Sequence, residues 1–402
     1  MANLSSAIGT DTTDRSLNFC LSSALRAFTG VLRYGVVMRI LGLVRERGSS
    51  CPRVGETVAF DVTQDGNSIN IQAAGIDIYF AVEGITLPLG TDASFAVWAL
   101  LPRAMEEGFN LHINRSIDPQ VAANAELLSQ IWETWVPGRY RSISVSGQGE
   151  WSRARRARSP QVQLFSGGID STFSIIENRK PQTHGVVATV SGIDKVSEAN
   201  FVRLIAKTEP LLKNLNCTRI LITSNAQHQP SSLTHGLTLA SCLFLLSDLF
   251  EQGTLAADFT QAQDLAVWPW GNNQVTNQYF AGSDFVVRTL GAEVGRTEKI
   301  ASIARAGIDL RSLSFCRQWN VIPSNCGTCR KCIRTKAMFL IATGSIPEIF
   351  IDNSFDERLL RKMVHHRVER AELFDLYSYA RKHASLGKIH SLVGLVEECR
   401  TE

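Results

Sequence analysis

Residues 161–250 alternate between short apolar runs and longer stretches in which apolar residues recur at helical spacing. Short apolar runs are typical of strands buried on both faces, and the periodic stretches predict helices. Strands and helices take turns along this region, which indicates an α/β fold with a parallel sheet covered by helices on both faces. The predicted strands are 162–165, 185–190 and 219–223, and the predicted helices are 172–178, 197–215 and 233–250.

The pattern before this region is different, because apolar residues there alternate with polar ones. Alternation predicts half-buried strands, and residues 64–67 have the composition of a turn between two of them. Residues 1–50 fit either an amphipathic helix or a helix followed by a strand. We therefore expect an N-terminal α+β part. Its predicted strands are 57–62, 68–73, 76–82 and 110–114, and its predicted helices are 94–107 and 119–135.

The patterns divide the chain into an N-terminal extension at 1–158, an α/β domain at 159–345 and a helical C-terminal tail at 346–402. Residues 147–160 carry Arg153, Arg155, Arg156 and Arg158. A solvated connector is the favoured interpretation of these arginines, and an anion-facing patch is the alternative. The tail is rich in charge, with helices expected at 356–376 and 377–399 that pack outside the sheet.

Composition and charge narrow the class of protein. A formal net charge of +3 is too small to argue for nucleic-acid binding by itself. The longest uncharged apolar stretch, 237–246, is about half as long as a membrane span and is expected to form a buried helix. No segment with the composition of a secretory signal opens the chain, so we expect a cytoplasmic protein that does not bind membranes.

The most informative segment follows the first strand of the α/β region. Two adjacent glycines there let the backbone turn and approach a ligand closely. The first turn of the next helix points free N–H groups at an anion, and the helix dipole adds positive charge. Asp170 is expected to hold Mg²⁺ or to accept backbone N–H bonds, because a carboxylate repels phosphate. The candidate phosphate-binding residues are Ser166, Gly167, Gly168, Asp170, Ser171 and Thr172.

No Gly-Lys-[Ser/Thr] follows, so this is not a Walker loop. The segment resembles the SGGxDS loop of the N-type ATP pyrophosphatases. The resemblance implies the PP-loop fold of the adenine-nucleotide α-hydrolase type, with ATP and Mg²⁺ as cofactors. It also implies that a substrate oxygen captures AMP while pyrophosphate leaves. An ordinary glycine–serine turn is the alternative interpretation.

Two further places match positions at which this family approaches ATP. His235 precedes a long apolar helix and is a candidate contact to the α-phosphate or the substrate; a capping or core histidine is the alternative. Residues 295–300 resemble the family's TK(A/E)EI stretch. Lys299, with Arg296 second, could therefore neutralise pyrophosphate charge, and a solvated basic pair is the alternative.

Four of the nine cysteines crowd into residues 316–332. Crowding of this kind does not suit a disulfide scaffold and suggests a metal. A C-x₂-C-x₂-C turn with one upstream cysteine fits a tetrahedral zinc site. An iron–sulfur cluster is less favoured, because no Cys-Pro follows. The predicted Zn²⁺ ligands are Cys316, Cys326, Cys329 and Cys332.

The order of phosphate loop, α/β domain and cysteine motif resembles the QueC-like enzymes, the 7-cyano-7-deazaguanine synthases, over residues 162–340. Arg334 falls close to an arginine of their motif. The resemblance implies a carbon–nitrogen ligase that adenylates a small carboxylic acid of the 7-carboxy-7-deazaguanine type. Ammonia or an amine would then give an amide or a nitrile. QueC-like proteins with extensions also occur in antiphage defence, which implies a protein as an acceptor.

The chain departs from this family outside the matched motifs. Residues 1–158 precede the phosphate loop, and 268–285 stand in place of the family's GYPDCR-type segment. The extension is expected either to recruit the amine-bearing partner or to support a homodimer. A tRNA-modifying ligase or thiolase, with nucleic acid on the arginine-rich connector, is the less favoured alternative. A non-catalytic zinc-containing scaffold is the alternative from another class.

Overall fold

The computed structural model describes residues 52–73, 75–152, 157–178, 184–192, 196–227 and 232–401. The predictions for residues 1–50 and for Arg153, Arg155 and Arg156 lie outside these residues. The chain from Ser50 to Glu402 forms one compact unit. The division at 158 and 345 into separate parts stays a prediction.

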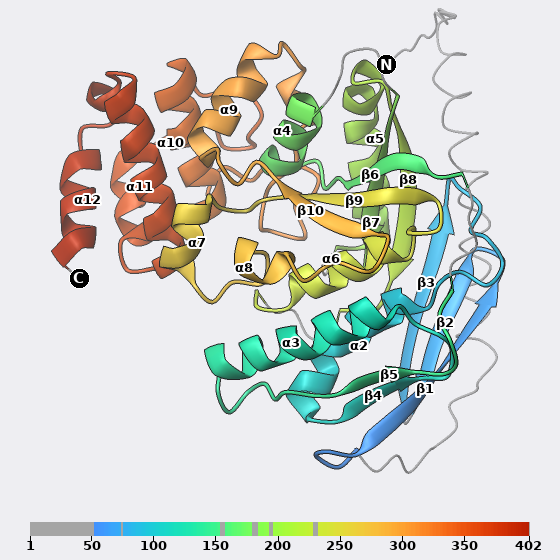
Figure 1. Cartoon of the computed structure of the whole chain (residues 1–402). Helices are drawn as coiled ribbons and strands as arrows, with labels where there is room; N and C mark the ends of the chain where they lie inside the picture. Colours follow the sequence, from blue (N-terminus) through green and yellow to red (C-terminus); the bar gives the residue numbers. More distant parts are fainter. Residues whose placement is uncertain are drawn as a thin grey trace, which may run out of the picture. The chain divides into compact units, whose positions relative to one another are not determined.

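One sheet runs through the described part of the chain (Figure 1). Its strands are β1 (Thr57–Asp65), β2 (Ser68–Ala73), β3 (Ile76–Glu83), β4 (Asn110–Ile113), β5 (Val145–Gly147), β6 (Ser159–Leu164), β7 (Gly185–Ser191), β8 (Cys217–Ser224), β9 (Phe250–Ala256) and β10 (Val286–Leu290). They follow the order β10-β9-β6-β7-β8-β3-β2-β1-β4-β5. Most neighbouring pairs are parallel, and the antiparallel ones join β1, β2, β3 and β8. The protein is therefore an α/β protein with a mostly parallel sheet.

Helices pack against this sheet and against one another in the described residues. They are α2 (Ser94–Glu107), α3 (Pro119–Trp135), α4 (Ile169–Asn178), α5 (Glu198–Asn214), α6 (His235–Phe244), α7 (Gln261–Val267), α8 (Gln274–Asn277), α9 (Arg296–Arg305), α10 (Arg330–Thr343), α11 (Arg367–Lys382) and α12 (Leu392–Thr401), with 3₁₀ turns η1 (Leu310–Ser312), η2 (Glu357–Met363) and η3 (Leu386–Lys388). None of these helices combines the length and the apolar character that crossing a membrane requires.

The five parallel strands β10-β9-β6-β7-β8 contain a reversal of strand order. β6 pairs with β7 on one side and with β9 on the other. The chain therefore runs outward from β6 to β8 and then returns past β6 to β9. Figure 1 shows α4 and α5 above these strands and α6 below them. Such a reversal opens a crevice at the carboxyl ends of the two central strands, here β6 and β9. The arrangement is Rossmann-like and confirms the predicted parallel α/β sheet.

The N-terminal strands continue the same sheet. β3 pairs antiparallel with β8, with Phe80 opposite Ser224 and Glu83 opposite Leu221. Side chains along β1 to β3 alternate between buried and more exposed positions, as the sequence pattern predicts. The β-meander is confirmed. The helices at Ser94–Glu107 and Pro119–Trp135 have the predicted bounds.

The helix predicted at 233–250 is wrong at its C-terminal end. α6 ends at Phe244, and Phe250–Ala256 forms β9. An apolar run does not by itself separate a buried helix from a buried strand. A Cβ at Gly253 of β9 would lie 3.0 to 3.1 Å from side-chain carbons of Leu243, so the glycine lets α6 pack closely on this strand. The sequence pattern misses β9 because the apolar run continues from α6 into this strand. It also misses β10, which has only five residues.

The C-terminal tail is helical, as expected, but its elements begin elsewhere. The stretch predicted as a helix at 356–376 starts as the 3₁₀ turn η2, and α11 begins only at Arg367. α11 packs against α7, α9 and α10. This packing places acidic side chains of the tail beside α9, which follows β10 in the chain.

Candidate functional site

The loop between β6 and α4 is held by its own hydroxyl groups. The Ser171 hydroxyl lies 3.2 Å from that of Ser166 and donates to the Gly168 carbonyl at 3.3 Å. Gly167 has a φ of +76°, and a Cβ there would lie 2.8 Å from Cγ2 of Thr208. The position therefore needs glycine both for its backbone conformation and for the close approach of α5.

This loop lies at the carboxyl end of β6, in the crevice that the reversal of strand order opens. α4 starts at Ile169, so its first-turn amides have no intrahelical acceptor and face the loop. Free amides at a helix N-terminus are an anion-binding arrangement. The structure thus places the predicted phosphate-binding residues Ser166–Thr172 where a doubly wound sheet binds its ligands.

Asp170 of this loop is bound by two cations from α9. Arg296 Nη2 lies 2.6 Å from Asp170 Oδ2, and Lys299 Nζ lies 3.1 Å from Oδ1. Burial alone would raise the pKa of Asp170, but the charges of Arg296 and Lys299 lower it below its ordinary value. No backbone N–H of the described residues donates to the Asp170 carboxylate, whose partners are the side chains of Arg296 and Lys299.

Arg296 and Lys299 are not a solvated basic pair, since their side chains are 9% and 1% exposed. Arg296 Nη1 also lies 2.5 Å from Oε1 of Glu372 on α11. Arg334 Nη2 of α10 approaches the same Glu372 oxygen at 3.3 Å. We call Asp170, Arg296, Lys299, Arg334 and Glu372 the charge network. It links α4, α9, α10 and α11 behind the phosphate loop.

A second carboxylate, Asp258, lies at the end of β9. Its Oδ2 accepts a hydrogen bond from Trp270 Nε1 at 2.8 Å and lies 3.5 Å from Nε2 of His235. Its backbone carbonyl accepts from Arg296 Nη2 at 3.2 Å. Burial alone would raise the pKa of Asp258, but the His235 hydrogen bond and charge, with Trp270, lower it. The candidate His235 therefore adjoins the charge network through Asp258.

Sequence reasoning misses Asp258, Trp270 and Glu372. Asp258 follows β9, a strand that the apolar pattern does not reveal. Once β9 is known, the position of Asp258 just after the carboxyl end of this parallel strand marks it as a candidate site residue. Glu372 comes from the tail, which carries no motif. The side chain of Lys331 is half-buried, and it has no hydrogen bond or ion pair with the residues that the structure describes. Burial and the nearby Arg296 and Arg334 lower the pKa of Lys331.

The four predicted metal ligands come together. The Sγ atoms of Cys316, Cys326, Cys329 and Cys332 all lie within 4.8 Å of one another. Zn–S bonds of about 2.3 Å in a regular tetrahedron would put the sulfurs about 3.8 Å apart. The Cys326–Cys332 and Cys316–Cys329 separations are 3.8 Å and 4.0 Å. The cluster could therefore bind a metal such as zinc.

Some of the basic residues around this cluster pair with carboxylates instead of offsetting the negative charge of the thiolates. Arg330 lies 3.3 Å from Glu369, and Arg334 pairs with Glu372. Lys336 is 1% exposed and donates to the carbonyls of Asp352 and Ser354. Its charge interacts with Cys332 and Cys326. Lys336 is therefore a cation that both braces the loop after α10 and offsets thiolate charge.

The cysteine segment is bonded to the phosphate loop. Ser314, two residues before Cys316, donates its N–H to the Gly167 carbonyl at 2.8 Å. The fully buried Asn325 accepts from Phe315 N at 3.0 Å and donates to the Leu313 carbonyl at 3.1 Å. Hydrogen bonds therefore connect the segment that carries the metal ligands to the phosphate loop.

No protein-family model, no curated protein and no solved structure matches this chain. The resemblance of residues 162–340 to the QueC-like enzymes therefore stays an expectation. The structure adds the geometry: the phosphate loop, the charge network and the cysteine cluster lie on elements that contact one another.

Proposed function

We propose that this chain is a QueC-like ATP-dependent ligase that adenylates a carboxylate, releases pyrophosphate, and passes the acyl group to ammonia or an amine. The supporting observation is the Ser166–Thr172 loop at the crevice between β6 and β9, backed by the buried pair of cations on Asp170. A phosphate-binding turn without a Walker lysine suits a reaction in which the terminal phosphates leave together.

The residues present fit a bound nucleotide. The Thr172 hydroxyl is buried and has no hydrogen-bond partner in the described structure, which is unusual unless a ligand supplies one. Ser166 and the amides of the first turn of α4 would bind the β- and γ-phosphates. Asp170 and Asp258 are the carboxylates that could hold Mg²⁺, which usually takes only one or two carboxylates beside phosphate oxygens. Bound Mg²⁺ would neutralise phosphate charge.

The reaction joins a carboxylate oxygen of the acid to the α-phosphorus. The new C–O–P link forms as the α–β phosphoanhydride bond breaks, and pyrophosphate leaves with the bonding electrons. Lys299 and Arg296 would supply positive charge beside the leaving group. His235, which lies beside Asp258, would contact the α-phosphate or the substrate. An amine nitrogen then attacks the acyl carbon, loses a proton and expels AMP. With ammonia as the amine, a nitrile requires a second adenylation, on the amide oxygen, which releases a second pyrophosphate. The nitrogen then loses both of its protons, and AMP leaves with the amide oxygen.

The cysteine cluster has a separate role in this proposal. One Zn²⁺ with four thiolate ligands has no open position, so it would hold the segment that carries Ser314 against the phosphate loop. It would take no part in activating the acid.

The test uses the full chain with ATP, Mg²⁺ and 7-carboxy-7-deazaguanine, with hydroxylamine added to trap an acyl adenylate. We expect AMP, pyrophosphate and a hydroxamate in equal amounts, and none of them without the acid. Mass spectrometry and an enzymatic pyrophosphate assay measure the products. ADP as the nucleotide product would contradict the proposal, and so would AMP whose formation does not depend on any acid.

A further inference from the structure

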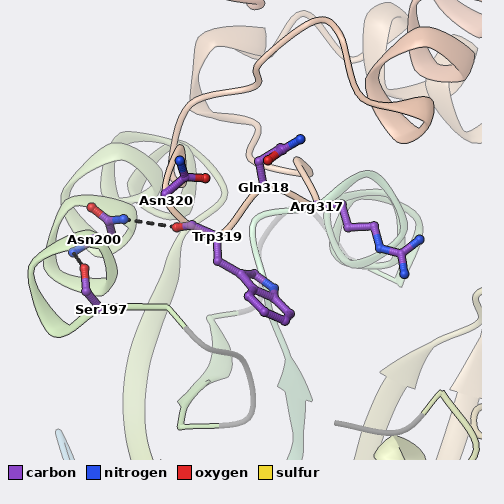
Figure 2. Close-up of a pocket in the computed structure, with 6 residues that line it drawn as sticks. All are labelled: Ser197, Asn200, Arg317, Gln318, Trp319 and Asn320. Atoms are coloured by element: carbon purple, nitrogen blue, oxygen red, sulfur yellow. Dashed lines mark hydrogen bonds between the residues drawn. The ribbon is translucent and has the colours of Figure 1, made fainter.

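A cavity of about 620 Å³ lies between the N-terminus of α5 and the segment after Cys316. Its size falls within the range of small-molecule sites. Figure 2 shows the Trp319 indole and the Arg317 guanidinium extending in different directions from the same segment. The lining residues are Ser197, Asn200, Arg317, Gln318, Trp319 and Asn320.

The backbone beneath the indole is fixed from two sides. Asn200 Nδ2 donates to the Trp319 carbonyl at 3.1 Å, the contact drawn in Figure 2. The Gln318 N–H donates to Sγ of Cys316 at 3.4 Å. The Trp319 side chain nevertheless is 38% exposed, so one part of the indole is open to a ligand. Because the backbone of Trp319 is fixed and part of its indole is exposed, the indole offers a flat surface that is already in place for a ligand.

The two chain segments that line this cavity, α5 and the segment around Cys316, also contact the phosphate loop through other residues. Ser314, on the segment that leads to Trp319, donates to the Gly167 carbonyl. On the other side, Leu204 and Thr208 of α5 approach the position of a Cβ on Gly167 at 3.6 and 2.8 Å. A ligand with an anionic end at the phosphate loop would therefore have its uncharged end within reach of the cavity.

We propose that this cavity binds the flat nitrogen heterocycle of a ligand whose anionic end lies at the phosphate loop, with the ring stacked on Trp319. This inference rests on the proposed function. Aromatic side chains stack on any base because every base has a π-face. Carboxamides of Gln318 and Asn320 supply donors and acceptors for ring nitrogens and exocyclic groups. The ring belongs either to adenine or to the acid, and separate ligands tell these sources apart.

The experiment is calorimetric titration of the metal-loaded full chain with three ligands: inorganic pyrophosphate, AMP and 7-carboxy-7-deazaguanine. Trp319→Leu should weaken binding of one ring ligand about tenfold to a hundredfold. Trp319→Phe, which keeps an aromatic face, should stay within about threefold of wild type. Pyrophosphate binding should not change in either variant. Tyr79→Ala, which removes an exposed aromatic ring on β3, is the matched control.

The outcomes separate this inference from the function on which it rests. The inference is overturned if Trp319→Leu binds AMP and 7-carboxy-7-deazaguanine as tightly as wild type does, or if wild type binds neither of these two ligands. The proposed function stands in both cases as long as wild type binds pyrophosphate. Failure of wild type to bind pyrophosphate removes the proposed function itself. Should Trp319→Leu not fold, the fluorescence change on adding each ring ligand is compared between wild type and Trp319→Phe. An equal change in both proteins would exclude stacking on Trp319.

Discussion

At the scale of single residues, Asp170 is the position on which the site depends. It carries one negative charge between two nearly buried cations, and Arg296 shares its other terminal nitrogen with Glu372. Buried cations keep their charge only when carboxylates compensate them. Asp170 therefore has a structural role as well as its place in the phosphate loop.

Asp170→Asn should destabilise the fold by about 2–4 kcal/mol, because it leaves Lys299 without its carboxylate partner. Pyrophosphate release should fall as well, since the loop loses its anchor to α9. Urea unfolding and the acid-dependent pyrophosphate assay measure the two effects. Asp309→Asn is the matched control, because Asp309 forms an exposed pair with Arg311 and should change neither measurement. Equal stability of the two variants would contradict the role assigned to the charge network.

The sequence identifies most of the residues at this site but not their partners. Ser166 to Thr172 and the four cysteines follow from short motifs, and Lys299 follows from the resemblance of residues 295–300 to a family stretch. All of these signals are local in the sequence. Asp258 and Glu372 do not, because they reach the site only through the pairing of β9 with β6 and the packing of α11 on α9. Contacts of such sequence separation leave no local pattern to read.

At the scale of elements, α11 joins the C-terminal tail to the start of α9. Asp375 of α11 accepts the Thr297 N–H at 2.8 Å and the Thr297 hydroxyl at 2.7 Å. It caps a helix whose N-cap residue, Gly295, has no side chain to do so. A Cβ on Gly295 would lie 1.8 Å from Asp375 Oδ1, so the glycine makes room for this cap.

Asp375→Asn should flatten the dependence of stability on pH between about 4 and 6. Burial raises the pKa of Asp375 to about 6, whereas an unfolded Asp titrates near 3.9. In that window the folded protein holds a proton that the unfolded chain releases. Stability therefore decreases as pH rises from 4 to 6, by about 1–2 kcal/mol after allowing for partial exposure.

The amide in Asp375→Asn can still accept from Thr297 and does not titrate. Chemical denaturation at closely spaced pH values compares the variant with wild type. Parallel curves for the two proteins would show that Asp375 does not cause the slope. Asp264, whose pKa burial also raises to about 6, would then be the next carboxyl to replace.

The elements differ in how well the sequence predicts them. α2 and α3 have their predicted bounds because Gly108 in a left-handed conformation ends α2 and Asp118 with Pro119 starts α3. Local signals of this kind set a helix boundary without help from tertiary contacts, so the sequence alone predicts it. The boundary between α6 and β9 has no such signal, since the apolar run continues through both. Tertiary burial alone determines where helix gives way to strand there.

At the scale of the whole molecule, the cysteine cluster supports the phosphate loop through Ser314 and Asn325. Full removal of the metal with a strong chelator should weaken pyrophosphate binding at least tenfold and lower the melting temperature. The physical reason is that metal binding and folding of the ligand segment are coupled, so loss of the metal releases the segment that carries Ser314. Calorimetry and metal analysis, with one Zn²⁺ expected per chain, measure these effects.

Cys329→Ser should reproduce the effect of the chelator or give insoluble protein. Cys217→Ser is the control, because Cys217 lies outside the cluster and its thiol donates to the Leu215 carbonyl, as a hydroxyl also can. A visible absorption band from iron would change the identity of the metal. Metal-free protein with an unchanged melting temperature would contradict the structural role.

The antiparallel pairing of β3 with β8 has a consequence for synthesis on the ribosome. Phe80 pairs with Ser224, and α2 packs against α6, so the partners of the N-terminal elements are translated much later. At about 5–20 residues per second, that delay lasts roughly 7–30 seconds. During this time the nascent chain exposes the edge of β3 and the apolar face of α2, whose residues from Phe95 to Leu101 are all buried in the finished protein. We therefore expect the first half of the chain to bind chaperones that associate with polypeptides as they leave the ribosomal tunnel.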